Sequence, residues 1–197
     1  MFTGIIQARG KIQKIEELEN GRKFFVHTPE LASKLELGDS LACNGTCLTV
    51  ETKVGEVVEL TAISQTLKLT LLGGLKEGDD INLETAATLQ TALGGHLVSG
   101  HVDGIAKVVE RTSPGTGAEV WLEIPEDLAN YTISKGSIGL DGISLTIAEK
   151  LDNRIKIALI PETLERTSAG DWQTGVGVHV EVDQMAKYVE NFMKSWK

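Results

Sequence analysis

Short segments in which apolar and β-branched residues alternate with polar ones, or run together, recur along the chain and are separated by glycine-rich turns. A period of two is typical of a β-strand with one buried face. Several such strands within about 90 residues favour a small closed barrel. The predicted strands cover residues 23–27, 57–62, 80–83, 120–124, 155–160 and 177–182.

Helical patterns are few. We expect a turn or so near residues 29–35 and 125–131, and a helical connector over residues 85–93. The C-terminal tail differs, because its apolar residues recur at the spacing of one helix face and Asp183 is placed to cap that helix. Either this apolar stripe packs on its own barrel or it joins subunits. The stripe consists of Met185, Tyr188, Val189, Phe192, Met193 and Trp196.

An internal repeat organises the chain. One constant shift places GDSLACNGTCLTV (38–50) on KGSIGLDGISLTI (135–147) and also matches Glu84 with Glu181. Near the start the shift is one residue shorter, and Thr3-Gly4-Ile5 meets Ser99-Gly100-His101. Several matches at one shift predict a duplication. We place the first unit at residues 1–97 and the second at 98–197, with the tail helix starting near residue 185.

Composition and charge narrow the function. The 197 residues include 19 Lys and Arg against 28 Asp and Glu, which gives a net charge of −9 without any basic run. We therefore expect no binding to nucleic acid or to anionic membranes. No stretch is apolar enough for a membrane span, and the N-terminal residues lack the apolar core of a signal peptide, so the cytoplasm is the expected location. With two cysteines and no Cys/His cluster, we expect neither a disulfide nor a metal.

Each unit contains a predicted β-hairpin. Asn44-Gly45 and Asp141-Gly142 occupy the same repeat position and favour the positive φ angles of a type I′ turn. The alternation of side chains then places Cys43 and Cys47 on opposite faces of the first hairpin. The two thiols therefore cannot form a disulfide with each other.

The face that carries Cys47 differs chemically between the two units. Cys47 and Thr49 share this face, and Ser144 and Thr146 hold the matching positions of the second hairpin. A thiol in one unit thus corresponds to a hydroxyl in the other. Two interpretations stay open: small polar side chains that satisfy neighbouring backbone groups, or a reactive pair.

The segment GGHLVSGHVDG (94–104) contains His96 and His101 among small residues that allow close approach of a ligand. Histidine is the usual general base near neutral pH. Their five-residue spacing predicts opposite faces of a strand, which argues against a shared metal. A buried structural role is favoured for His96. Lys135 and the pair Glu162-Thr163 are either ligand-positioning groups or solvated surface residues.

Taken in order, five motifs resemble the riboflavin synthase family over essentially the whole chain. The resemblance implies an all-β fold of two similar six-stranded Greek-key barrels and a C-terminal helix that assembles a homotrimer. It also implies a site formed between the first barrel of one subunit and the second barrel of its neighbour. The motifs are MFTGII, GDSLACNGTCLTV, GGHLVSGHVDG, KGSIGLDGISLTI and LIPETLERTSAG.

The resemblance further implies a reaction. Two molecules of 6,7-dimethyl-8-ribityllumazine dismutate, and one donates a four-carbon unit to the other to give riboflavin and 5-amino-6-ribitylaminouracil. No cofactor is implied. Two related half-sites suit this chemistry, because they hold two identical substrates in complementary orientations and remove much of the entropy of their encounter.

Site residues carried over from the family fall into two expected groups. The first half-site is expected to contain Gly4, Ile5, Ile6, Cys47, Leu48, Thr49, Thr61, Ala62, Ile63, Ser64, Gln65 and Thr66. The second is expected to contain Gly100, His101, Val102, Lys135, Ser144, Leu145, Thr146, Ala158, Leu159, Ile160, Pro161, Glu162 and Thr163.

Catalytic roles are hypotheses drawn from the same resemblance. His101 is the leading candidate for the base that removes a proton from the 7-methyl group of the substrate. Cys47 and Ser144 are candidates for nucleophile or hydrogen-bond donor, and Thr146 belongs to the same reactive set. Ser40 and Asp183 are expected in supporting roles.

One residue departs from the family pattern, and two alternative functions remain. Gln65 stands where the family usually has glutamate and where the second unit has Glu162. A neutral amide still donates and accepts hydrogen bonds. One alternative is a non-catalytic lumazine- or flavin-binding protein of the same fold. The other is an unrelated double-barrel protein that binds sugars or oligonucleotides, against which the acidic charge and the 5% aromatic content argue.

Overall fold

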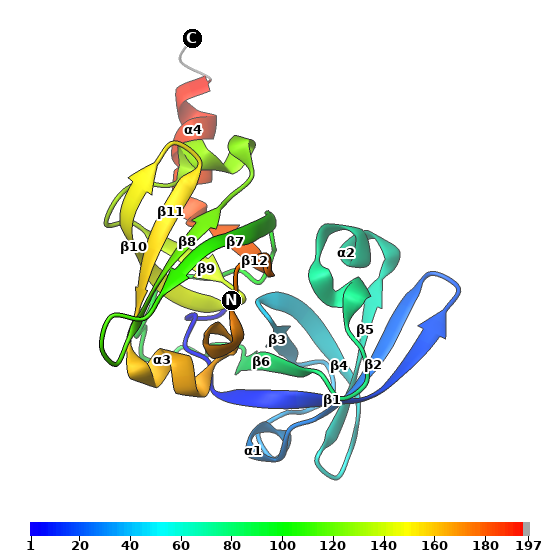
Figure 1. Cartoon of the computed structure of the whole chain (residues 1–197). Helices are drawn as coiled ribbons and strands as arrows, with labels where there is room; N and C mark the ends of the chain where they lie inside the picture. Colours follow the sequence, from blue (N-terminus) through cyan, green and yellow to red (C-terminus); the bar gives the residue numbers. More distant parts are fainter. Residues whose placement is uncertain (195–197) are drawn as a thin grey trace.

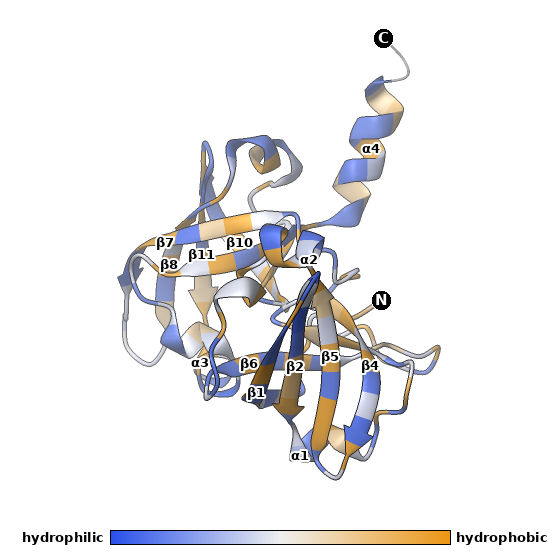
Figure 2. Cartoon of the chain, turned by 90° about the vertical axis from the view of Figure 1, so that its right-hand side faces the viewer, coloured by the Kyte–Doolittle hydropathy of each residue, from blue (hydrophilic) through white to orange (hydrophobic). Residues whose placement is uncertain are grey.

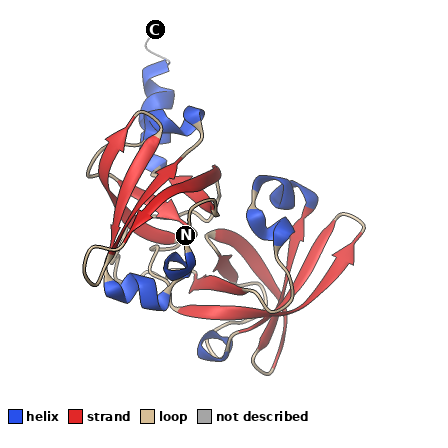
Figure 3. Ribbon diagram, in the orientation of Figure 1, coloured by secondary structure: helices blue, strands red, loops and turns tan. Residues whose placement is uncertain are grey.

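A computed structural model describes residues 1–194, which form two closed antiparallel β-barrels side by side and one C-terminal helix (Figures 1 and 3). The N-terminus lies between the barrels, and the C-terminal helix extends away from the second (Figure 1). This confirms the predicted fold class. In residues 1–194 no helix is long and apolar enough to cross a bilayer.

The first barrel contains six strands in the order β1-β2-β5-β4-β3-β6, which is a Greek-key arrangement. Short helical turns connect some of them, and α2 with η1 links β5 to β6. The elements are β1 (Ala8–Leu18), β2 (Gly21–His27), α1 (Pro29–Ala32), β3 (Ser40–Cys43), β4 (Thr46–Val54), β5 (Val57–Ile63), α2 (Ser64–Leu69), η1 (Leu71–Gly74) and β6 (Asp80–Thr85).

The second barrel repeats this plan, with β10-β11-β8-β7-β12-β9 as its closed order. The short helices α3 and η3 follow β11 as α2 and η1 follow β5, so the predicted duplication is confirmed at the level of each element. The elements are β7 (Gly104–Thr112), β8 (Ala118–Glu123), η2 (Glu126–Tyr131), β9 (Ser137–Leu140), β10 (Ile143–Leu151), β11 (Arg154–Leu159), α3 (Pro161–Arg166), η3 (Ser168–Asp171), β12 (Gly177–Val182) and α4 (Gln184–Lys194).

Each barrel encloses its own apolar core, to which alternate residues of its strands contribute.

The predicted hairpins are confirmed: φ is 44° at Asn44 and 79° at Gly45, and 47° at Asp141 and 80° at Gly142. Cys43 pairs with Thr46 and lies in the first core. The Cys43 thiol is therefore unavailable to solvent.

The two hairpin tips meet at the centre of the molecule. A Cβ atom built on Gly45 would lie 2.6 Å from the backbone nitrogen of Gly142, and one built on Gly142 would lie 2.7 Å from that of Gly45. No side chain fits at either position. Glycine is therefore required here both for its positive φ and for the close approach of the barrels.

Two local expectations are wrong. Residues 86–93 fall within the predicted helical connector but form an irregular segment, and Thr85 ends β6. The backbone nitrogens of Thr88 and Gln90 donate to threonine hydroxyls there. Threonine hydroxyls compete with helical backbone bonds, which explains the failure. Residues 96–101 are not a strand but an irregular segment with one bridge, Phe2 to Val98, so strand alternation cannot assign the faces of His96 and His101.

The tail helix α4 forms as predicted, and the Asp183 carboxylate caps it by accepting a hydrogen bond from Met185 N at 2.9 Å. The helix projects from the second barrel (Figure 2). The described residues of its apolar stripe stay 53–66% exposed, so its own barrel covers them only in part. Trp196, the last residue of the stripe, lies outside the described residues.

Candidate functional site

The N-terminal segments of the two units exchange barrels. The backbone nitrogen of Ser144 in the second barrel donates to Gly4 O at 2.8 Å, and that of Cys47 in the first barrel donates to Gly100 O at 2.8 Å. The expected grouping is therefore wrong: Gly4–Ile6 belong with Ser144, and Gly100–Val102 belong with Cys47. Each segment precedes the first strand of its own barrel and crosses to the other one, where Phe2 and Val98 pair them.

Two buried glutamates hold the exchanged segments. Glu84 accepts hydrogen bonds from Thr3 N and Thr3 Oγ1, both at 2.7 Å, and from Gly4 N at 3.0 Å. Glu181 binds Ser99 and Gly100 in the same way. Burial raises the pKa of both carboxyl groups, and these hydrogen bonds oppose that shift. The repeat match of these two residues was the only signal for this role in the sequence.

Glycine allows each exchanged segment to reach its half-site. Gly4 has φ +75°, and a Cβ atom there would lie 2.5 Å from the Cβ of Ser144. Gly100 has φ +83°, and a Cβ atom there would lie 2.6 Å from the Cβ of Cys47. Any side chain at these positions would displace the residue beside it, because real Cβ atoms do not approach so closely.

The first half-site is an open hollow of about 190 Å³ at Cys47. Cys47 is partly exposed, whereas Cys43 is 1% exposed and burial raises the pKa of its thiol. Because the thiolate is the reactive form, Cys43 is the inert cysteine. The residues that line this hollow are Thr46, Cys47, Ile63, Gln65, Thr66, Leu69, Thr70, Gly100, His101 and Val102.

The second half-site is an open hollow of about 360 Å³ at Ser144. Lys135 enters it from a backbone conformation with φ 68°, held by its N–H bond to Ile147 O at 2.7 Å. It is the cationic side chain at this hollow. The residues that line it are Lys135, Ser144, Leu145, Thr146, Ala148, Ala158, Ile160 and Thr163.

His96 lies beside the second half-site through its contact with Ser144, a position that the sequence did not predict. Its Nδ1 lies 2.7 Å from the hydroxyl oxygen of Ser144, and its buried Nε2 has no protein partner in the described part of the chain. Burial lowers the pKa of His96, and the Asp183 charge opposes this. A neutral ring can accept the Ser144 proton. A Cβ atom at Gly95 would lie 2.6 Å from Ser144 Cβ, so glycine also lets this segment approach.

Several expected site residues do not present side chains to a hollow. Leu48, Ala62 and Leu159 are at most 6% exposed and pack in the barrel cores, so only their backbones can face a ligand. Ser40 pairs with Thr49 in the β3–β4 ladder and lines neither half-site. Glu162 forms an ion pair with Arg166 on the exposed face of α3.

Among residues 1–194, no three His, Cys, Asp or Glu side chains come close enough together to hold a metal ion. The polar groups at both hollows are instead a thiol, hydroxyls, amides, imidazoles and one ammonium. Such groups bind an organic ligand rich in hydrogen-bonding atoms and can move protons on it.

Comparison with known proteins decides between the possible families. The lumazine binding domain matches twice, over residues 3–86 and 99–183. A riboflavin synthase of Escherichia coli (strain K12) is 41% identical and aligns with 96% of this chain and 90% of its own length. A riboflavin synthase of Mycobacterium tuberculosis (strain ATCC 25618 / H37Rv) is 41% identical, with 99% of each chain aligned. The chain belongs to the riboflavin synthase family.

Solved structures of the same fold agree with this membership. LumP complexed with 6,7-dimethyl-8-(1'-D-ribityl) lumazine has a TM-score of 0.83 and 30% identity, over 92% of this chain and 99% of that one. LumP complexed with riboflavin has a TM-score of 0.86 and 31% identity, over 93% and 100%. Membership in the riboflavin synthase family excludes an unrelated double-barrel protein for sugars or oligonucleotides.

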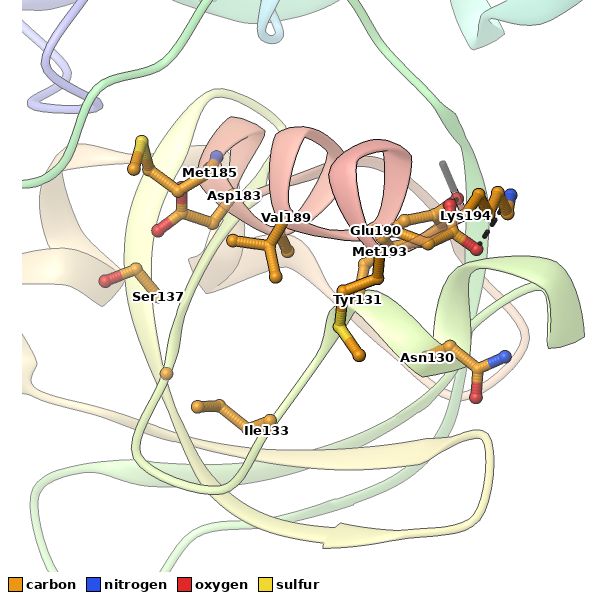
Figure 4. Close-up of a pocket in the computed structure, with 12 residues that line it drawn as sticks. Asn130, Tyr131, Ile133, Ser137, Asp183, Met185, Val189, Glu190, Met193 and Lys194 are labelled. Carbon is orange, nitrogen blue, oxygen red and sulfur yellow. Dashed lines mark hydrogen bonds and ion pairs between the residues drawn. The ribbon is translucent and has the colours of Figure 1, made fainter. Parts of the chain in front are cut away.

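In this member of the riboflavin synthase family, a further hollow lies away from Cys47 and Ser144. It measures about 610 Å³ and lies between α4 and the second barrel, where Val189 and Met193 face Ile133 (Figure 4). Its lining is mainly apolar and includes neither Cys47 nor Ser144. The candidate thiol and hydroxyl therefore lie at the two smaller hollows.

Proposed function

We propose that the chain catalyses the dismutation of two molecules of 6,7-dimethyl-8-ribityllumazine. One molecule donates a four-carbon unit and becomes 5-amino-6-ribitylaminouracil, and the other accepts the unit and becomes riboflavin. The atoms of the two products equal those of the two substrates, so the reaction needs neither an oxidant nor a cofactor. The names of the relatives and the LumP ligands support this substrate.

The observation that carries the proposal is the pair of matched but chemically different half-sites. Cys47 lines its hollow with His101, and Ser144 bonds to His96 beside its own hollow. A dismutation asks two copies of one molecule to play different roles. Related pockets with different reactive groups meet that demand, because each binds the same ring but treats it differently.

We assign His101 as the base that removes a proton from the 7-methyl group of the lumazine in the first half-site. Cys47 lies beside it as nucleophile or hydrogen-bond donor. In the second half-site His96 accepts the Ser144 proton, which raises the nucleophilicity of that hydroxyl oxygen. Thr146 supplies a further hydroxyl there, and Asp183 supports the charge on His96.

We propose that the chain works as a homotrimer with each site between subunits. The two hollows share no lining residue, so rings bound in them would stay apart within one chain. The Cys47 hollow is also smaller than the ~300–1,000 Å³ that encloses an organic ligand of this size. The exposed stripe of α4 provides an apolar surface for assembly. A cytoplasmic location remains our prediction.

A non-catalytic lumazine- or flavin-binding protein is the second candidate, because solved structures of the same fold are complexes with a lumazine or with riboflavin. Purified protein given the lumazine alone distinguishes the two. The enzyme consumes two lumazines for each riboflavin and forms the aminouracil in equal amount. Binding without any riboflavin formation would contradict the proposed activity.

A further inference from the structure

His179 on β12 of the second barrel joins two segments of the first barrel. It is 2% exposed. Its Nδ1 lies 2.7 Å from Asn44 O, and Leu71 N donates to its Nε2 at 2.6 Å. A carbonyl oxygen only accepts and a backbone N–H only donates, so the ring is the neutral tautomer with its hydrogen on Nδ1. Both ring nitrogens are thus committed to backbone groups across the barrel interface.

The two segments that His179 holds lead into two of the segments that line the Cys47 half-site. Asn44 stands in the hairpin turn that leads directly into β4 and Cys47. Leu71 follows Thr70, which lines the same hollow and donates from Oγ1 to Thr66 O at 2.7 Å. His179 therefore fixes the hairpin turn relative to the segment that follows α2. Residues next to both contacts, Cys47 on one side and Thr70 on the other, line the same hollow.

The repeat-equivalent residue in the first barrel does the same for the second. Asn82 donates from Nδ2 to Asp141 O at 2.9 Å and accepts from Ser168 N at 2.8 Å. Asp141 stands in the turn that leads to Ser144, and Ser168 follows α3. Asparagine and histidine share one feature, a donor and an acceptor at fixed separation, which explains how two different residues fill equivalent positions.

Asp141 holds the His179 backbone in place. Its Oδ1 accepts from His179 N at 2.9 Å, and its Oδ2 accepts from Trp172 Nε1 at 3.1 Å. The same Oδ1 lies 3.7 Å from His179 Nδ1. Nothing in the proposed chemistry uses His179 or Asp141. Their buried polar groups are satisfied only when the barrels are docked in this one arrangement.

We propose that His179 is a positioning residue for the Cys47 half-site, acting across the barrel interface through Asn44 and Leu71. Asn82 has the corresponding role for the Ser144 half-site. This inference rests on the proposed function for the identity of the ligand, whereas the contacts themselves do not depend on it.

The test measures how well riboflavin protects Cys47 from alkylation by iodoacetamide, with mass spectrometry of the full-length protein. In His179→Leu, we expect half-protection to need about tenfold more riboflavin, the effect of one lost buried hydrogen-bond pair. His179→Asn introduces the residue that the first barrel has at the equivalent position, Asn82. It should restore protection to near the wild-type level. Circular dichroism and thermal unfolding confirm that each variant is folded.

A second variant tests the contact from the other side. Leu71→Pro deletes the N–H that donates to His179, at a helix start that tolerates proline and after a residue with φ −129° and ψ 167°. It should weaken protection as His179→Leu does. Leu71→Ala, which keeps that N–H and loses the side chain packed near Gly177, separates the two effects and should leave protection near wild type. Asn82→Leu is the matched control, because it loosens the other half-site and should leave Cys47 protection near wild type.

Two results would overturn the inference: unchanged protection in a folded Leu71→Pro or His179→Leu protein, or equal loss in Asn82→Leu, which would indicate general loosening. Wild-type protein that riboflavin never protects would instead contradict the proposed function and, with it, this assignment of the ligand.

Discussion

The Ser144 hydroxyl oxygen lies 2.7 Å from Nδ1 of His96, although 48 residues separate them in the chain. No such partner stands at the same distance from Cys47 among the described hydrogen bonds. Thiols are in general stronger nucleophiles than hydroxyls, and a hydroxyl needs a base beside it. The two half-sites therefore differ in whether an imidazole is hydrogen-bonded to the nucleophilic candidate.

Ser144 and His96 should act as one unit. Ser144→Ala and His96→Gln should each lower kcat. The loss should be at most about 10²–10⁴-fold, which is what a general base contributes. The double variant should be no slower than the slower single variant, because each change removes the same interaction. Steady-state kinetics of the four proteins measure this, and losses that multiply would show that the two residues act independently.

The protonation of His96 should contribute to the pH dependence of the free energy of unfolding. Its pKa is lowered from the ordinary value of 6.5 because the ring is buried, so the unfolded chain binds this proton first as pH falls. The contribution of His96 is therefore present above pH 6.5 and is lost as pH falls through and below that value.

Urea unfolding of wild type and His96→Gln between pH 7.5 and about pH 5 checks this sign. The difference in the free energy of unfolding between them should shift steadily against wild type as pH falls. A difference that stays constant, or shifts in favour of wild type, would contradict a neutral, buried His96.

The two cysteines should separate activity from stability. Cys47→Ala should lower turnover strongly, whereas Cys43→Ala should leave turnover unchanged and destabilise the fold by about 1 kcal/mol, as a small core truncation does. With intact protein, iodoacetamide should label Cys47 and spare Cys43. Equal effects on turnover, or labelling of Cys43 in the folded protein, would contradict the assignment of their faces.

Residues near a turn proved predictable from sequence, because their conformation depends on local chemistry. Asn44-Gly45 and Asp141-Gly142 fixed the register of both hairpins, and the register placed Cys47 and Cys43 on their opposite faces. The repeat predicted the second barrel from the first. The helices α2 and α3 escaped detection because six residues with no buried side chain carry no periodic signal.

Contacts between distant segments could not be predicted in this way. The resemblance named Gly4, Gly100, Cys47 and Ser144 as site residues, but nothing local shows that Gly4 meets Ser144 and Gly100 meets Cys47. His96 was missed for the same reason, since its partner is set by the path of the chain between the barrels. The exchange arises from tertiary packing around Phe2 and Val98.

Removing the stripe of α4 should prevent assembly. A chain ending at Lys187 lacks Tyr188, Val189, Phe192 and Met193, and each large apolar side chain buried between subunits is worth about 1.5–3 kcal/mol. Because each barrel has its own core, the shortened chain should stay β-rich while it sediments as a monomer. Activity should fall and recover partly at high protein concentration.

Leu89→Ser is the control for this truncation, because it removes an apolar side chain that is fully exposed on the connector without touching α4. It should leave the sedimentation coefficient unchanged. A shortened chain that keeps the full-length assembly would show that α4 does not hold the subunits together.

The central claim is that a Cys47 half-site and a Ser144 half-site from different subunits meet to form one active site. Mixing tests it most directly: Cys47→Ala and Ser144→Ala proteins are unfolded together, refolded as mixed assemblies and assayed with the lumazine alone. Mixed assemblies pair an intact Cys47 of one chain with an intact Ser144 of another, so riboflavin formation should rise well above the sum of the two proteins refolded separately. A mixture that stays at that sum would contradict the account and place both halves of the site within a single chain.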